Sequence, residues 1–528
     1  MIFKSPHAPV SIPEITITDY VLLRADEFGN KPALVDGPTG RVYTYRQLPV
    51  IINKLAVGLR SHGLARGEVF AIYAPNLPEY VLAFHAVASL GAVTTMVPPL
   101  FTDEEIAKQL RDSDAKFLLT IPQLMPTAME MAKATGIQKL FVIGEAEGAV
   151  SFESLLSNAS PAQPLTPIPS MEEVAVLPYS SGTTGFPKGV MLTHRNLVAM
   201  LRQIEVGDSL TEDDTMVCVV PMSHLYGLHV VANQGLSQGA TIVTLPRYEL
   251  GQFLETLERY RVTVAPLVPP LVLTLSHAPQ IEDYDLSALR MVHCGAATLA
   301  DTVAQACKAR LGCEIRYGYG LTEVSPLSHA SLADPSTHRA GSVGFCLPNT
   351  ECKIVAYDTG AELEANQEGE ICVRGPQVMR GYLGNPEATA QMIDADGWLR
   401  TGDVGYCDSE GRLFVVDRIK ELIKTNGRQV APAELEAILL SHEAIADAAV
   451  IPAPDESAGE VPKAFVVLQA DAEPRSDEIL KEIMSFVASR VAPYKRLRSV
   501  EFVTEIPKSP AGKILRRVLI ERERRERA

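Results

Sequence analysis

Short apolar runs alternate with helical patterns along the first half of the chain. Residues 69–73 form a run typical of a buried strand, residues 78–90 have the pattern of a helix, and residues 91–97 form the next strand-like run. This β-α-β alternation predicts a parallel sheet with helices on both of its faces. Comparable strand-like runs follow at residues 116–120, 139–143, 216–220, 240–245 and 262–268.

The C-terminal part of the chain has a different order of elements. From residue 434 onward, a helix, strands at 448–451 and 463–468 and a helix at 476–489 predict a compact α+β unit. A chain of 528 residues is too long for one hydrophobic core, so three or four domains or subdomains are expected. The segment at 157–170, rich in Pro and Ser, is predicted to be a linker or a surface excursion.

Charge and cysteine content exclude several classes of protein. The 48 basic and 64 acidic residues give a net charge of −16, which argues against a nucleic-acid binder or a protein held on anionic membranes. The eight cysteines lack Cys-x-x-Cys spacing, as expected for reduced thiols rather than a disulfide or zinc framework. No signal peptide or membrane-spanning run is recognisable. We therefore expect a cytoplasmic protein, either a monomer or a homodimer.

One stretch, residues 179–189, has the composition of a phosphate-binding loop. Its sequence, Tyr-Ser-Ser-Gly-Thr-Thr-Gly-Phe-Pro-Lys-Gly, lies between two apolar runs, which predicts a strand, a loop and a strand. Glycines let backbone N–H groups approach an anion, hydroxyls add donors and Lys188 adds a positive charge, so the loop can hold a polyphosphate. The spacing differs from a Walker A loop, which also runs into a helix. The alternative is a polar surface loop.

This stretch resembles the phosphate loop of the adenylate-forming superfamily, which includes acyl- and aryl-CoA ligases, insect luciferases and the adenylation domains of peptide synthetases. Segments 317–323, 398–403 and 507–517 match further motifs of that superfamily in the same order. The resemblance spans about residues 20–517 and is strongest to 4-coumarate-CoA-ligase-like enzymes.

The resemblance implies an α/β fold in three parts. The large N-terminal domain, residues 1–417, would contain doubly wound β-α sheets and a small β-barrel-like subdomain. A hinge at residues 418–424, with Lys420 as the hinge residue, would lead into a small mobile α+β domain at residues 425–528.

The resemblance also implies that the reaction uses ATP and coenzyme A as cosubstrates and Mg²⁺ as a cofactor. The metal would be held by Thr184 and Glu323, because magnesium prefers hard oxygen ligands. Lys513 is implied as the catalytic lysine, and Tyr317 departs from the glutamine usual in the superfamily. The residues implied for ATP or AMP are Ser180, Ser181, Gly182, Thr183, Thr184, Gly185, Lys188, Ala297, Tyr317, Gly318, Tyr319, Thr322, Asp403, Arg418 and Lys513.

His224 follows a predicted strand, at the end of the sheet where open α/β proteins bind ligands. The resemblance implies that it orients the substrate carboxylate; the alternative is a structural histidine. The implied acyl pocket consists of Tyr226, Val230, Ala296, Gly318, Gly320, Pro326 and Leu327. The residues implied for CoA are Arg247, Lys424, Asn426 and Gly427, with Gln429 as a further catalytic residue beside Lys424. For Arg247 the alternative is a solvated arginine on a loop.

The reaction implied is the activation of a carboxylic acid as an acyl-adenylate and its transfer to the CoA thiol. The substrate carboxylate attacks the α-phosphorus, and positioned positive charge stabilises the transition state. Val230 and His293 stand where plant coumarate ligases have polar or basic residues, so both a 4-coumarate-like aryl acid and a medium- or long-chain fatty acid remain candidate substrates. Transfer to an acyl-carrier protein and a non-catalytic nucleotide-binding protein are the alternative functions.

Overall fold

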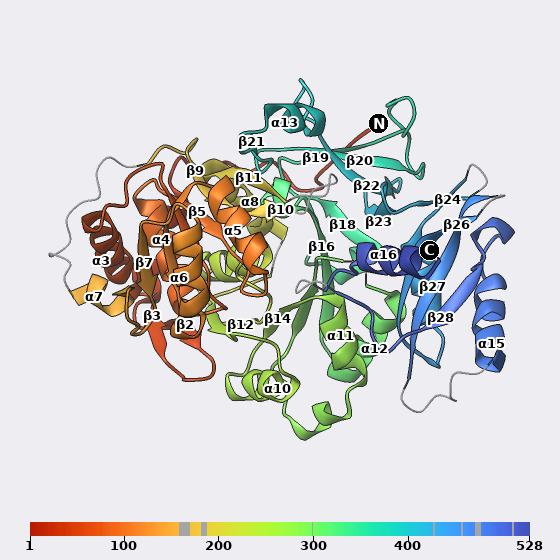
Figure 1. Cartoon of the computed structure of the whole chain (residues 1–528), viewed down its shortest axis with the longest axis horizontal. Helices are drawn as coiled ribbons and strands as arrows, with labels where there is room; N and C mark the ends of the chain where they lie inside the picture. Colours follow the sequence, from red (N-terminus) through yellow and green to blue (C-terminus); the bar gives the residue numbers. More distant parts are fainter. Residues whose placement is uncertain are drawn as a thin grey trace.

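The fold is described from a computed structural model, which describes residues 1–157, 169–180, 187–207, 209–297, 299–425, 428–455, 458–469, 477–508 and 512–527. Figure 1 shows two large sheets, an antiparallel layer above them and a separate blue C-terminal unit at the right. Each motif segment of the sequence contributes described residues to a cavity where these parts meet.

The first sheet has a parallel centre with helices on its faces, as the alternating pattern predicts. Its order is β10-β11-β9-β5-β4-β6-β7-β8, and β21 also pairs with β11. The three pairings of β11, with β9, β10 and β21, are antiparallel. The strands are β4 (Val69–Ile72), β5 (Val93–Met96), β6 (Ala115–Thr120), β7 (Lys139–Val142), β8 (Val150–Ser151), β9 (Val174–Leu177), β10 (Tyr179–Ser180), β11 (Lys188–Thr193) and β21 (Gly381–Tyr382).

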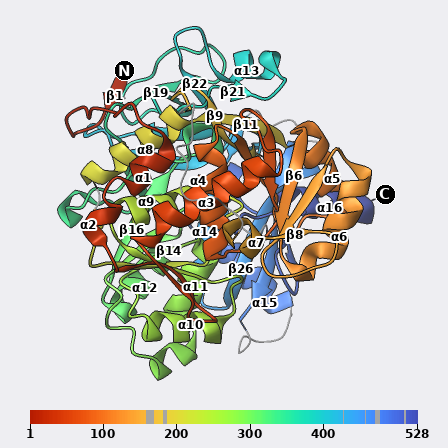
Figure 2. The same cartoon turned by 90° about the vertical axis from the view of Figure 1, so that its left-hand side faces the viewer.

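Helix α4 (Pro78–Ser89) lies at the centre of the large part of the molecule. All of its residues from Pro78 to Ala88 are buried, including the polar Glu79 and His85, as expected for a mostly apolar helix in the interior of a large protein. Figure 2 looks onto α3 and α4 from the side opposite the small C-terminal unit. The other helices around this sheet are α1 (Ile17–Leu22), α2 (Ala25–Phe28), α3 (Gln47–Ser61), α5 (Asp103–Asp112), α6 (Met125–Ala134), α7 (Phe152–Ser157) and α8 (His194–Gly207).

The second sheet is parallel over six strands, in the order β16-β15-β14-β12-β13-β2, with β3 antiparallel at its edge. Except for β16, the parallel strands are mostly apolar and mostly buried, as expected where both faces of a parallel sheet are covered. The strands are β2 (Pro32–Asp36), β3 (Val42–Thr44), β12 (Thr215–Cys218), β13 (Thr241–Thr244), β14 (Val264–Leu267), β15 (Met291–Cys294) and β16 (Glu314–Tyr319). Its helices are α9 (Gln234–Ser237), α10 (Leu250–Arg259), α11 (Pro269–His277) and α12 (Asp301–Leu311).

An antiparallel layer continues the second sheet beyond β16 and corresponds to the expected small β-barrel-like subdomain. Its order is open, β17-β18-β23-β22-β20-β19-β1, and the N-terminal strand forms its far edge. The strands are β1 (Ile2–Lys4), β17 (His329–Ala330), β18 (Ser342–Cys346), β19 (Glu351–Val355), β20 (Gly369–Arg374), β22 (Leu399–Cys407) and β23 (Leu413–Arg418). Helix α13 (Pro386–Met392) packs beside it.

The C-terminal unit is built on a five-stranded sheet in the order β25-β24-β27-β26, with β28 paired to β27. This is the compact α+β unit that the sequence pattern predicts. Its strands are β24 (Ile423–Thr425), β25 (Arg428–Val430), β26 (Ile445–Asp455), β27 (Gly459–Leu468) and β28 (Ser499–Phe502), and its helices are α14 (Pro432–Leu440), α15 (Asp477–Ala488) and α16 (Arg516–Arg527).

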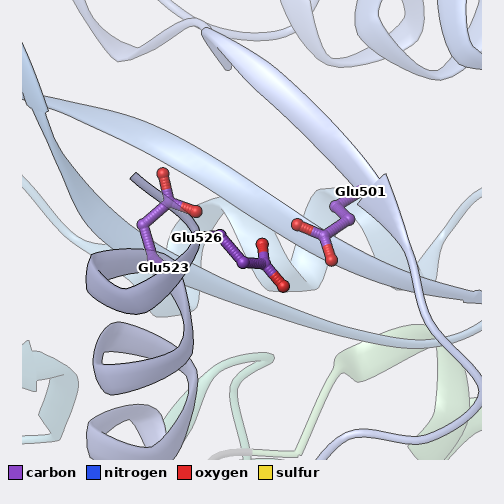
Figure 3. Close-up of side chains that lie close together, drawn as sticks. All are labelled: Glu501, Glu523 and Glu526. Carbon is purple, nitrogen blue, oxygen red and sulfur yellow. The ribbon is translucent and has the colours of Figure 1, made fainter. Parts of the chain in front are cut away.

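Helix α16 is fixed to this sheet by charged side chains. Figure 3 shows Glu501, Glu523 and Glu526 gathered between α16 and β28. The Lys463 ammonium lies 2.7 Å from Glu501 Oε2 and also binds Glu523, and Arg522 binds Glu501 as well. Two cations of the protein itself therefore compensate much of the charge of this acidic group.

Candidate active site

A cavity of about 730 Å³ lies where the C-terminal ends of the second sheet meet the antiparallel layer and the C-terminal unit. Its walls include residues that directly follow β12 and β14, the end of β15 and most of β16. Open α/β sheets bind ligands at this end of their strands. From the C-terminal unit, Lys513 and Arg516 also line the cavity.

Glu323 lies at the first polar cluster of the cavity, in the single-turn helix η4 (Thr322–Val324). Its Oε1 accepts a hydrogen bond of 2.7 Å from Ser180 Oγ and one of 2.8 Å from Tyr382 OH. The Lys188 ammonium lies 5.0 Å from the centre of the Tyr382 ring. Among the described residues Glu323 has no ion-pair partner, although its side chain is buried. A carboxylate in that situation fits a divalent cation, so the residues present suit Mg²⁺.

Asp403 forms a second polar cluster, on the neighbouring wall. Its Oδ2 accepts a hydrogen bond of 2.7 Å from Tyr319 OH, and its Oδ1 lies 3.0 Å from Arg418 Nε. Asp403 and Arg418 are directly paired across β22 and β23, which explains why the two side chains meet. Burial raises the pKa of Asp403, while the Arg418 charge opposes this rise. The three residues implied for adenosine are thus assembled at one place.

Lys513 reaches these clusters from the C-terminal unit. Its side chain remains exposed but lies in the cavity, where the surrounding protein partly desolvates the ammonium group. This desolvation, followed by the nearby Arg418 charge, lowers the pKa of Lys513, and the carboxylates of Asp403 and Glu323 oppose the change. Lys513 is therefore close to both polar clusters, although it lies far from them in the sequence.

His224 and Tyr226 follow β12 and form the deeper wall of the cavity. Burial, with a smaller effect of the Lys513 charge, lowers the pKa of His224 to about 4, so its imidazole is neutral at pH 7. Tyr226 begins the helix η2 (Tyr226–Asn233), which has π-type hydrogen bonding. Its hydroxyl lies 3.1 Å from the Leu267 carbonyl oxygen and 3.0 Å from that of His293, and these contacts fix its ring between two strands.

The remaining residues expected in the acyl pocket also line the cavity: Val230, Ala296, Gly318, Gly320, Pro326 and Leu327, together with Ala297, Tyr317 and Thr322. One of them, Gly320, must be glycine for steric reasons, and Gly318 is tightly packed. A Cβ at Gly320 would lie 1.9 Å from the Pro326 carbonyl oxygen, and one at Gly318 would lie 3.1 Å from Leu327 Cδ1. These close approaches shape the floor of the pocket.

Several expected residues are not part of the cavity. Arg247 is exposed on a loop and does not line it. Lys424 and Gln429 face each other across the hairpin of β24 and β25, and both are exposed outside the cavity. Lys420 does line it. Ser181, Gly182, Thr183, Thr184, Gly185, Asn426 and Gly427 lie outside the described residues.

The structure adds one residue that sequence reasoning missed. Tyr382 reaches Glu323 because the two-residue strand β21 pairs with β11. The local sequence around Tyr382 has no motif, so only knowledge of this long-range pairing could have found it.

Comparisons with known proteins agree with the geometry. The family model of the AMP-binding enzyme matches residues 23–383, and that of the AMP-binding enzyme C-terminal domain matches residues 434–513. The chain is 42% identical to 4-coumarate--CoA ligase 1 of Solanum tuberosum, covering 98% of this chain and 96% of the relative. The 4-coumarate--CoA ligase 1 of Arabidopsis thaliana is also 42% identical, with 98% and 95% covered.

Solved structures give the same result. The anthranilate CoA ligase AuaEII in complex with anthranoyl-AMP superposes with a TM-score of 0.90 at 27% identity, covering 98% of both chains. The o-succinylbenzoate CoA synthetase of Bacillus subtilis, in complex with its acyl-adenylate, superposes with a TM-score of 0.82 at 28% identity, covering 96% of this chain and 98% of that one. No helix in the described ranges is long and apolar enough to cross a membrane. The chain therefore belongs to the AMP-binding enzymes and is an AMP-forming acid–CoA ligase.

Proposed function

We propose that this ligase activates an aryl or arylalkenyl carboxylic acid of the 4-coumarate class. The observation that carries this proposal is the position of the Tyr226 ring, which is held toward the cavity because its hydroxyl can donate its proton to either of two nearby carbonyl oxygens. The small Gly295 lies beside this ring. A held aromatic wall favours a flat substrate, because ring–ring contact adds about 0.5–1.5 kcal/mol to burial alone. The similarity to 4-coumarate–CoA ligases supports the same class.

A medium- or long-chain fatty acid is the second candidate substrate. It is favoured by Val230, an apolar side chain on the wall of the cavity, which cannot form a hydrogen bond with a phenol. Val230 is buried and apolar, and His293 Nε2 lies 3.1 Å from the sulfur of Met291. An alkyl chain would need no hydrogen bond there.

We infer the following roles in the first half-reaction. Asp403 holds the ribose hydroxyls, and Tyr319 lies against the adenine. Glu323 holds the Mg²⁺ that neutralises the phosphates, and Lys513 stabilises the charge that develops on them. His224, which is neutral at pH 7, donates a hydrogen bond that orients the substrate carboxylate without the full charge of an ion pair. The carboxylate therefore keeps its nucleophilicity toward the α-phosphorus.

The second half-reaction requires a different arrangement of the C-terminal unit, and we propose that it turns about a hinge at residues 418–424. This is supported by the position of Lys513 within the cavity while Lys424 and Gln429 are exposed outside it. A rotation about Lys420 would withdraw Lys513 from the cavity and bring the face that carries Lys424 and Gln429 to the acyl group. Such a rotation is a recognised form of domain motion. Residues 1–417 and 425–528 would move as the two bodies.

We also propose a cytoplasmic location. All eight cysteines are buried and unpaired, as expected in a reducing compartment. Fractionation of cells that express the tagged full-length chain tests this, and recovery in an oxidising compartment would contradict it.

The deciding experiment is an assay of AMP and pyrophosphate release with CoA, Mg²⁺ and three panels of acids: cinnamates, benzoates and straight-chain fatty acids. Turnover restricted to the cinnamates and benzoates is the expected result. Turnover with fatty acids alone would select the second candidate. Pyrophosphate release without thioester formation would point to a carrier-protein acceptor, and a Lys513→Ala variant supplies the background rate.

A further inference from the structure

The first helix of the C-terminal unit, α14, is capped by a residue from the opposite side of the hinge segment. The N–H groups of the first helical turn need an acceptor, and Ala431 at the N-cap position has no side-chain oxygen to offer. Asp417 Oδ2 accepts the Ala433 N–H at 2.9 Å, and Asp417 Oδ1 accepts the Arg418 N–H at 2.7 Å. Both oxygens of the Asp417 carboxylate are therefore bound to backbone groups.

Charge favours this contact. A carboxylate at a helix N-terminus interacts favourably with the helix dipole. Asp417 is 8% exposed, and its burial raises its pKa, but the nearby Arg516 charge and the two N–H groups oppose that rise. The buried carboxylate depends on these partners, since a buried charge without them is costly.

The capped helix also fixes the segment that carries Lys513. Glu436, on α14, binds Arg516 Nη2 through both carboxylate oxygens, at 2.9 and 2.7 Å. Arg516 Nε donates to the Val450 carbonyl oxygen at 3.2 Å, and the Glu421 carboxylate also binds Arg516. Because Arg516 follows Lys513 by three residues, the position of α14 determines where Lys513 enters the cavity.

We propose that Asp417 is a positioning residue for the adenylation step. Its cap on α14 holds the C-terminal unit in the arrangement that places Lys513 in the cavity, beside the ribose site formed by Arg418 and Asp403. The cap spans the hinge, so it breaks when the unit turns for thioester formation. This inference rests on the proposed catalytic role of Lys513 and on the proposed hinge.

Two variants remove the contact from opposite sides. Asp417→Ala removes the acceptor, and Ala433→Pro removes the donor N–H while keeping the carboxylate. Proline is tolerated in the first turn of a helix, and α11 of the same chain begins with the pair Pro269 and Pro270. The matched control is Thr16→Ala, which removes an equally buried cap from α1, where Thr16 Oγ1 accepts the Asp19 N–H at 3.2 Å.

Each variant is tested by ATP–pyrophosphate exchange, by thioester formation from supplied acyl-AMP and CoA, and by thermal unfolding. Asp417→Ala and Ala433→Pro should each lower the exchange rate by about three- to thirtyfold, which is the factor that corresponds to the loss of a helix cap. The rate of thioester formation should change by less than about twofold. Thr16→Ala should lower the melting temperature and leave both rates within about twofold.

Equal losses in both half-reactions, or an exchange rate as high as in the unaltered enzyme, would overturn the positioning role of Asp417. Lack of exchange with any acid in the unaltered enzyme would instead refute the proposed function. If Asp417→Ala does not fold, Ala433→Pro still decides the question, because it leaves the carboxylate in place.

Discussion

Replacing Tyr382 by phenylalanine should slow adenylation by removing one hydrogen bond from Glu323. The Tyr382 side chain is buried, and its hydroxyl donates to Glu323 Oε1 at 2.8 Å. Burial and the Glu323 carboxylate raise the pKa of Tyr382, so the donated proton is present at every working pH. The phenylalanine ring keeps its position under Lys188, so only the hydrogen bond is lost.

The size of the effect follows from the chemistry of the pair. A hydrogen bond to a charged group contributes about 1.5–3 kcal/mol, which corresponds to a factor of about 10 to 150 in rate. Ser180 Oγ still donates to the same oxygen at 2.7 Å, so Glu323 remains partly held. We therefore expect the lower end of the range, about a tenfold loss in kcat/KM for adenylation.

The assay is ATP–pyrophosphate exchange over a range of Mg²⁺ concentrations. A carboxylate that is less well oriented should require more Mg²⁺ for half-maximal rate. Tyr382→Leu also removes the contact with the Lys188 ammonium and should cost a further few-fold. The control is Tyr406→Phe, since the Tyr406 ring stacks on Phe414 at 4.8 Å outside the cavity. An exchange rate within twofold of the unaltered enzyme, or an equal fall in both half-reactions, would refute the reasoning.

Three further predictions concern the hinge, the pocket floor and acid stability. Lys513→Ala should lower the adenylation rate by about 100-fold or more and leave thioester formation from acyl-AMP nearly intact. Lys424→Ala should instead slow thioester formation more than adenylation. Equal losses in the two half-reactions would contradict the proposed hinge. Gly320→Ala places a Cβ 1.9 Å from the Pro326 carbonyl oxygen and should lower both the melting temperature and the adenylation rate. Burial lowers the pKa of three histidines that do not line the cavity to about 3 or 4, below the unfolded value. Below about pH 6.5 the unfolded chain therefore binds more protons than the folded chain. The free energy of unfolding should be lower at pH 5 than above pH 6.5, by about 2 kcal/mol per histidine. A free energy of urea unfolding that is unchanged between pH 7 and pH 5 would disprove this. They are His85, His194 and His229.

The parallel strands were predictable because each carries its own signal. The run at 116–120 corresponds to β6 and the run at 240–245 to β13, within one residue at each end. Buried strands are continuous apolar runs with turn residues at their ends, so short stretches of sequence are enough to place them. The position of His224 after β12 was predictable for the same reason.

The assembled site was predictable only in part. The resemblance named Asp403 and Arg418 separately, but their contact depends on the register between β22 and β23. Tyr382 was missed because it acts through pairing with a strand about 190 residues earlier in the chain. Asp417 and Ala433 are close in sequence, yet no local pattern shows that a strand residue caps the following helix. Long-range register and domain contacts are what single-sequence patterns lack.

If the C-terminal unit turns about the proposed hinge, the contact across it has to be weak, because every catalytic cycle would break it. Among the described residues it includes the Asp417 cap and a small apolar cluster of Val404, Leu422 and Ala431. A cap contributes about 1 kcal/mol, which changes a two-state population by about fivefold. That is enough to favour the arrangement with Lys513 in the cavity before ATP binds. It is also small enough for the energy of binding CoA to reverse, since moving an equilibrium from 1:99 to 99:1 takes only about 5.5 kcal/mol. A stronger contact would favour the first half-reaction at the expense of the second.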